Sequence, residues 1–130
     1  MEEYPPQPPG PPLKIYDQCL MESVGIEANG DFFLAMVHAG APLGTFGGMF
    51  FSTSDDNQSE ITLKVCAGTN SFASRNRSLG TYVVMGVPPA AGGEPRIEVQ
   101  FTAAEDGTLE VTARDRASRQ ELWVQHTPIE

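Results

Sequence analysis

The sequence predicts an all-β fold, namely an antiparallel β-sandwich of about seven or eight short strands. Three observations lead to this prediction. Short stretches alternate apolar and polar residues with a period of two, and glycine, proline, Asn-Gly or Asp-Gly residues separate them. No apolar pattern at helical spacing continues over about 11 residues without a glycine or proline. A length of 130 residues is sufficient for one domain of this kind.

The first strands are predicted to form a hairpin. Val24–Ile26 leads into Asn29-Gly30, a two-residue turn signal that requires positive φ angles, and residues 31–37 return as the second strand. Gly47 and Gly48 precede a strand at Met49–Thr53. The polar residues 54–59 then form a predicted loop.

The later strands show the period of two most clearly. Ile61, Leu63 and Val65 alternate with polar residues, which places three apolar side chains on one face. Asp106-Gly107 joins two alternating segments and forms the clearest predicted hairpin. The strands expected in this part are Ile61–Val65, Tyr82–Met85, Ile97–Phe101, Leu109–Ala113 and Leu122–Val124.

Composition excludes several classes of function. Eight basic residues against 17 acidic ones leave a net charge of −9, whereas a nucleic-acid binder needs a basic face, and an acidic chain is also disfavoured at an anionic membrane. No apolar run reaches the roughly 18 residues of a membrane span. The start Met1-Glu2-Glu3 is unlike a signal peptide, so we expect a cytoplasmic location. Cys19 and Cys66 have no metal-binding spacing and are expected as small apolar residues, although a bridge between them stays open in an oxidising compartment.

Proline dominates the beginning of the chain. Six of the 11 prolines fall in the first 12 residues, where the missing backbone donors exclude both a helix interior and a sheet ladder. We therefore expect residues 1–12 to form a disordered tail or linker, with a ligand for a partner's aromatic groove as the alternative. The folded domain is expected at residues 13–126 and a flexible C-terminus at 127–130.

The sequence shows no arrangement typical of catalysis. His38 and His126 have no ligand-like spacing, and the adjacent Asp55 and Asp56 are expected to be solvated loop residues. The three arginines of the predicted last turn are expected to form a solvated rim: Arg114, Arg116 and Arg119. We expect no enzyme activity, no cofactor and no metal site from these residues.

Several ordered motifs carry a specific pattern. They are FSTSDDNQSEITLKVCAG (51–68), RSLGTY (77–82), GVPPA (86–90), PRIEVQF (95–101), AEDGTLEVTARD (104–115) and, earlier, VGIEANG (24–30). Together they resemble the β-sandwich substrate-binding domain of the Hsp70 chaperones, over roughly residues 13–124. The resemblance implies a domain that binds extended, hydrophobic stretches of unfolded polypeptide in a channel between loops.

The resemblance also assigns residues to the peptide site. A central hydrophobic pocket is implied at five apolar positions, which a pure core interpretation explains equally well: Ile26, Phe51, Ile61, Leu63 and Ile97. The loops over the peptide are implied to contain Ala28, Asn29, Ser52, Ser54 and Gln58.

Other positions depart from the family pattern. Asn29 and Ser54 replace the larger apolar residues that usually arch over the peptide, so a looser or hydrogen-bonded arch is expected. Gly92 stands where the family has the arginine that latches a helical lid, opposite Asp56, and too few residues follow Val124 for lid helices. Residues 13–17 are expected to be a degraded form of the family's linker to the ATPase domain, which the chain lacks, and ATP hydrolysis is therefore not expected.

Three functions remain open from the sequence. The first is a peptide-binding module without its own ATPase domain and lid, whose partners are unfolded peptides and a separate Hsp70 ATPase domain or co-chaperone. The second is a degenerate scaffold that acts as a protein-interaction or regulatory domain without binding peptide in a channel. The third is a small hydrolase that uses Asp55 or Asp56.

Overall fold

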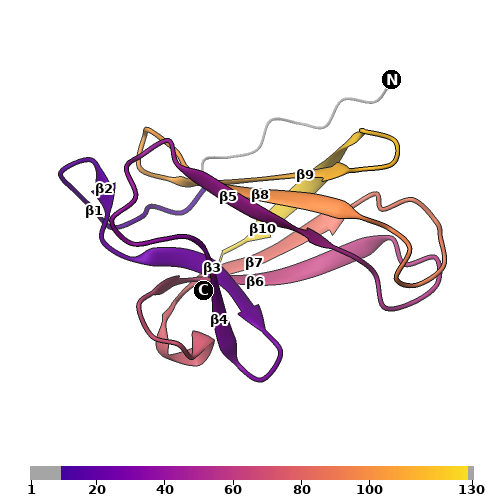
Figure 1. Ribbon diagram of the computed structural model, residues 1–130, viewed down its shortest axis with the longest axis horizontal. Coiled ribbons are helices and arrows are strands. Elements are labelled where there is room, and N and C mark those ends of the chain that lie inside the picture. Colours follow the sequence, from indigo (N-terminus) through magenta and orange to yellow (C-terminus); the bar gives the residue numbers. More distant parts are fainter. Residues whose placement is uncertain (1–9, 129–130) are drawn as a thin grey trace.

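The structure is a computed structural model that describes residues 10–128 and is almost entirely β (Figure 1). Short alternating segments rich in β-branched and aromatic residues form the strands, as such residues favour a pleated, half-buried surface. The elements are β1 (Ile15–Tyr16), β2 (Cys19–Leu20), β3 (Ser23–Ala28), β4 (Phe32–Val37), β5 (Phe46–Phe51), β6 (Glu60–Gly68), the 3-10 helix η1 (Ala73–Arg75), β7 (Arg77–Met85), β8 (Ile97–Ala103), β9 (Leu109–Asp115) and β10 (Glu121–Thr127).

Eight of the strands form one antiparallel sheet that bends into two layers. Its strand order is β4-β3-β6-β7-β10-β9-β8-β5, and β1 and β2 form a separate hairpin. The layers share β10, because residues 121–122 pair with β9 whereas residues 123–127 pair with β7. This arrangement confirms the predicted antiparallel β-sandwich.

The sheet almost closes on itself where its two edge strands meet. No ladder joins β4 to β5, but they approach so closely that a Cβ atom on Gly47 would lie 1.9 Å from the carbonyl oxygen of Met36. Only glycine permits this approach of two backbones. The two edges therefore touch at this point without pairing as a sheet.

The core lies between the two layers and follows the predicted alternation. On β8, Ile97, Val99 and Phe101 are completely buried, whereas the side chains between them face outward. The other strands of the large sheet border the same interior, and the half-buried Met36 and Met49 pack against it from the two edges. Among residues 10–128, no helix is long and apolar enough to cross a membrane.

The β3–β4 turn differs in one detail from the expectation. It contains Asn29, Gly30 and Asp31, and the positive φ angles belong to Gly30 (80°) and Asp31 (65°), because hydrogen bonds from a distant loop hold Asp31 in this conformation. The predicted hairpin is confirmed, but its turn has three residues and not the predicted two.

The segment expected to be a degraded linker forms the β1–β2 hairpin instead. Its turn residues Asp17 and Gln18 both have positive φ, which is uncommon for residues other than glycine. At the ends of the domain, Pro12 bridges to Thr108, and β10 includes Thr127, which pairs with Thr81. Ordered contacts thus extend slightly beyond 13–126, whereas the tail interpretation otherwise concerns residues 1–9, outside the described residues.

Candidate functional site

Two turns, each adjoining one of the two edge strands of the sheet, are each supported by a second loop. The β3–β4 turn lies beside η1 and the loop before it, and the β5–β6 loop (52–59) lies beside the β7–β8 loop (86–96). Figure 1 shows these two pairs well apart, the first at the bottom of the view and the second at the right. Edge strand β4 begins at the β3–β4 turn, and edge strand β5 ends at the β5–β6 loop.

The β5–β6 loop is organised by one side chain. The Oε1 atom of Gln58 accepts hydrogen bonds from the backbone N–H groups of Ser54 (3.2 Å) and Asp55 (3.1 Å), and from the Ser54 hydroxyl (3.3 Å). The Nε2 of Gln58 donates to the carbonyl oxygen of Glu60 at 2.7 Å. Gln58 therefore fixes the shape of the loop that follows β5.

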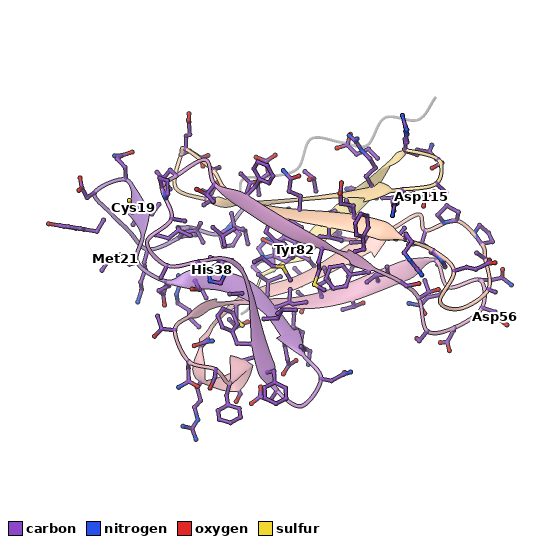
Figure 2. All side chains as sticks on the ribbon, viewed as in Figure 1. Cys19, Met21, His38, Asp56, Tyr82 and Asp115 are labelled. Carbon is purple, nitrogen blue, oxygen red and sulfur yellow. The ribbon has the colours of Figure 1, made fainter. Side chains whose placement is uncertain are left out.

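The β7–β8 loop holds the β5–β6 loop from outside. The carboxylate of Asp56 accepts a hydrogen bond from the Gly92 N–H (2.8 Å), and the Asn57 N–H donates to the carbonyl oxygen of Ala90 (2.8 Å). Asp56 lies at the far end of this pair of loops in Figure 2. The acidic residue and the glycine singled out in the sequence thus meet directly, although through a backbone donor and not through an arginine.

The five residues assigned to the pocket lie in one hydrophobic cluster. Ile97 faces Phe51 across the β5–β8 ladder, and Ile26 lies on β3 next to β6, which carries the other two residues. Four of them are only 0–6% exposed, whereas Phe51 is half-buried. The structure brings the five together, but Ile26, Ile61, Leu63 and Ile97 belong to the core and expose almost no surface.

Surface that a ligand can reach lies on the edge strands. Directly opposed residues of an antiparallel pair share one face, and Ile26 is opposite Leu34 while Ala28 is opposite Phe32. Leu34 and Phe32 therefore stand on the same face as the buried Ile26, yet they are 40% and 59% exposed. At this edge, apolar side chains that stand on the inner face of the sheet are therefore exposed to solvent.

The other edge strand presents its inner face in the same way. Met49 is opposite Val99 and Phe51 is opposite Ile97, so both point inward, and both are half-buried. We call these four residues the apolar opening: Phe32, Leu34, Met49 and Phe51. The inward residues of the neighbouring strands are buried, whereas the four residues of the apolar opening are exposed or half-buried.

Phe32, Leu34 and Met49 were not assigned to the site from the sequence. The signal was present in the run Phe32–Val37, which is apolar at every position and so has no solvated face. An edge strand with two apolar faces buries both of them only if other groups pack against each face.

The residues assigned to the arch lie in the two turns. Asn29 and Ser54 are exposed, and among the described residues no hydrogen bond joins them; Ser54 bonds to Gln58 within its own loop. Ala28 is half-buried at the end of β3, and Ser52 is exposed directly after β5. Of the two expected alternatives, a looser arch or a hydrogen-bonded one, the hydrogen bond is not formed between these two side chains.

The remaining candidates lie elsewhere in the fold. His38 is exposed after β4, and the ring of His126 stacks on Tyr82 with centroids 4.3 Å apart. The guanidinium group of Arg116 lies over the ring of Phe50 on the outer face of β5. Within residues 10–128, no three His, Cys, Asp or Glu side chains are grouped to hold a metal ion.

The two cysteines are both free thiols. Burial raises the pKa of Cys66 to about 11, with a further contribution from the negative charge of Glu27, so this thiol stays protonated at neutral pH.

The fold and the apolar opening define a two-layer antiparallel β-domain that exposes apolar side chains of its inner face along one edge. A family model described as Hsp70 protein matches residues 12–129. The chain belongs to the Hsp70 family, and the domain is related to those chaperones.

Proposed function

We propose that this domain binds extended, hydrophobic segments of unfolded polypeptide along the apolar opening, between the β3–β4 turn and the β5–β6 loop. The observation that carries the proposal is the exposure of Leu34 and Phe32 on the same face as the buried Ile26. Membership of the Hsp70 family supports a polypeptide ligand in general. The apolar character of the opening supports a hydrophobic one.

The physical basis of binding is the burial of apolar surface from both partners. Covering one leucine side chain of the ligand contributes about 1.5–3 kcal/mol, and a small module without a cover is expected to bind with micromolar or weaker affinity. The buried Ile26 stands opposite Leu34 and the buried Ile97 opposite Phe51, so this surface borders the apolar core. Backbone groups of an extended ligand add contacts that do not depend on its sequence.

The proposal includes binding at equilibrium, without ATP hydrolysis by these residues. A cycle driven by ATP would need a nucleotide-binding domain elsewhere; such a domain or a co-chaperone is a proposed partner. We further propose a reducing, cytoplasmic setting, in which Cys19 and Cys66 remain free thiols.

Fluorescence anisotropy of a labelled heptapeptide with a central leucine tests this function. We expect saturable binding, and Leu34→Gln weakens it about fivefold to tenfold because an apolar contact is lost. Phe46→Gln is the matched control: Phe46 is also an exposed apolar residue of an edge strand, at 64%, but it stands on the outer face of β5. The affinity of the Phe46→Gln variant for the peptide is expected to stay within about twofold of the wild-type value.

Two results contradict the proposal. Absence of saturable binding by the wild-type domain favours the scaffold function, in which the fold is retained without a peptide channel. Equal losses in Leu34→Gln and Phe46→Gln place binding outside the apolar opening.

A further inference from the structure

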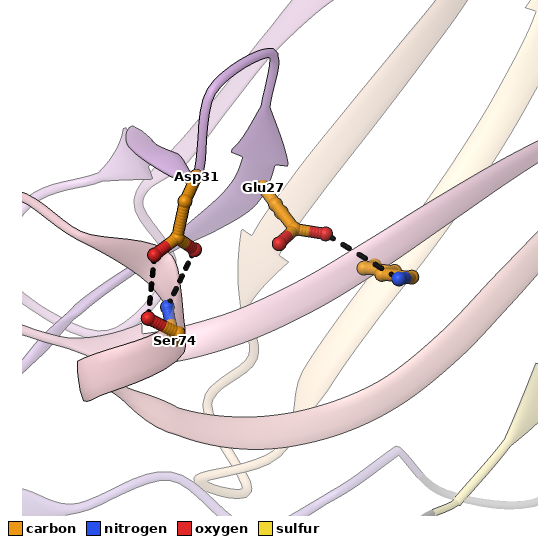
Figure 3. A network of polar contacts seen from close by, with 4 residues as sticks. Glu27, Asp31 and Ser74 are labelled. Carbon is orange, nitrogen blue, oxygen red and sulfur yellow. Dashed lines mark hydrogen bonds and ion pairs between the residues drawn. The ribbon is translucent and has the colours of Figure 1, made fainter.

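The β3–β4 turn is fastened to a loop far away in the sequence. The backbone N–H of Phe33 donates to the Ser71 carbonyl oxygen at 2.9 Å, and the N–H of Ala73 donates to the carbonyl oxygen of Asp31 at 2.8 Å. The Asp31 carboxylate also accepts hydrogen bonds from the backbone N–H and the hydroxyl of Ser74, at 2.9 and 2.5 Å. Figure 3 shows both contacts between Asp31 and Ser74.

The loop that holds the turn has its own internal hydrogen bonds. The Asn76 amide accepts from the N–H of Asn70 (3.0 Å) and donates to its carbonyl oxygen (2.9 Å), while the Asn70 side chain accepts from the Phe72 N–H (2.9 Å). The short helix η1 follows directly and presents the Ser74 N–H. Hydrogen bonds within the loop thus support the segment to which the turn is fastened.

Asp31 is suited to this contact by its conformation and its charge. Its φ of 65° lies in the left-handed region, which aspartate tolerates better than most residues. Hydrogen bonds from Ser74 lower its pKa below the ordinary value, so the carboxylate is charged at neutral pH. Hydrogen bonds to a charged acceptor are stronger than those between neutral groups.

We propose that the Asp31–Ser74 contact is a positioning clamp that sets how long a bound peptide stays in the apolar opening. This inference rests on the proposed function. Asp31 lies between Asn29 and Phe32, on the turn that borders the opening, so its carboxylate fixes one wall of the site without contacting the ligand. A turn released from the loop fluctuates more, and peptide leaves through the widened side.

The kinetics of peptide exchange test the clamp. Asp31→Gly removes the carboxylate but keeps a residue that adopts positive φ without strain. We expect the dissociation rate of the labelled heptapeptide to rise about threefold to tenfold, while the association rate stays within about twofold. Asp31→Asn, which retains one acceptor oxygen for Ser74, is expected to give an intermediate dissociation rate.

A second hairpin offers a matched control. The carboxylate of Asp106 accepts from the backbone N–H and hydroxyl of Thr108 in the β8–β9 turn, at 3.0 and 2.6 Å, and thus makes the same pair of bonds away from the opening. Asp106→Gly is expected to leave both rates unchanged. Amide exchange at Phe33 and Ser74 should accelerate in Asp31→Gly but not in Asp106→Gly.

The outcomes separate this inference from the proposed function. Wild-type protein that binds no peptide overturns both. Wild-type protein that binds, with Asp31→Gly showing an unchanged dissociation rate or the same acceleration as Asp106→Gly, overturns the clamp alone. Should Asp31→Gly fail to fold, Ser74→Ala removes one of the two bonds and must give the faster dissociation.

Discussion

The hydroxyl group of Tyr82 lies in the core and has no hydrogen-bond partner among the described residues. The residue is 3% exposed, and burial raises the pKa of its phenol far above the ordinary value. The neighbouring His126 stacks on the ring, but its Nε2 lies 2.7 Å from the carbonyl oxygen of Leu79 and donates there. The phenol therefore stays neutral and loses its bonds to water without replacement.

At the residue scale, Tyr82→Phe is expected to stabilise the domain by about 1–2 kcal/mol, because it removes a buried polar group that has no partner among the residues described. Urea denaturation measures the change in unfolding free energy. Tyr16→Phe serves as the control, since Tyr16 is 75% exposed, and should change stability by less than about 0.5 kcal/mol. A clear destabilisation of Tyr82→Phe would show that the hydroxyl is hydrogen-bonded.

At the scale of elements, the β3–β4 hairpin gives the site its shape. Its register shifts between Val24 and Gly25, and the strands come so close that a Cβ atom on Gly25 would lie 2.0 Å from the Leu34 carbonyl oxygen. A bulge of this kind bends a strand and increases its twist. The tip of the hairpin lies beside η1 (Figure 1), and Leu34 and Phe32 on β4 are exposed.

Gly25→Ala is expected to cost about 2–4 kcal/mol of stability, because the new methyl group collides with backbone atoms that cannot move aside. Thermal and urea unfolding measure this loss. Gly40→Ala is the control: no atom lies within 4 Å of its added Cβ, so only the positive φ of 89° opposes it, at about 1 kcal/mol. Equal losses in the two variants would mean that the hairpin relaxes around the added methyl group without cost.

At the scale of the whole molecule, a net charge of −9 is distributed over a small domain. Most acidic groups are exposed, and hydrogen bonds lower the pKa of two of them: Ser74 lowers the pKa of Asp31, and Thr108 lowers the pKa of Asp106. In both cases the pKa in the folded state lies below the value of 3.8 expected when unfolded. The unfolded state thus binds protons first as the pH falls.

The stability of the domain is therefore expected to decrease as the pH falls below about 3.8, through the folded-state pKa values. The contribution of the two carboxylates is fully present above this pH. Urea denaturation at pH 7, 4 and 3 measures the dependence. The double variant Asp31→Asn with Asp106→Asn should show a flatter profile, and an unchanged slope between pH 4 and 3 would contradict the prediction.

The positions of the main strands and their buried faces were predictable because they depend on local order. Alternation at Ile97, Val99 and Phe101, and turn residues such as Asp106-Gly107, act between neighbours in the chain. The β1–β2 hairpin was missed, because its turn residues Asp17 and Gln18 lack the glycine that usually marks positive φ. Where a turn carries no such local signal, the sequence does not predict it.

The candidate site was predictable only in part. The resemblance placed five apolar residues together, but it did not show that Ile97 is sealed while Leu34 is exposed, since both are equally apolar. Exposure depends on whether another strand covers a face, and this is decided by which edges meet.

The sequence by itself determined the class of fold, most of its turns and the residues that form the core, since each follows from the period of side chains along a strand. Only the tertiary structure decided that β10 joins the two layers, that Phe32 and Leu34 on β4 stay exposed, and that Asp31 meets Ser74 across 43 residues. These contacts join segments that are far apart in the sequence. The local sequence of one segment does not indicate which distant segment it packs against, so the free energy of the contact depends on the whole fold.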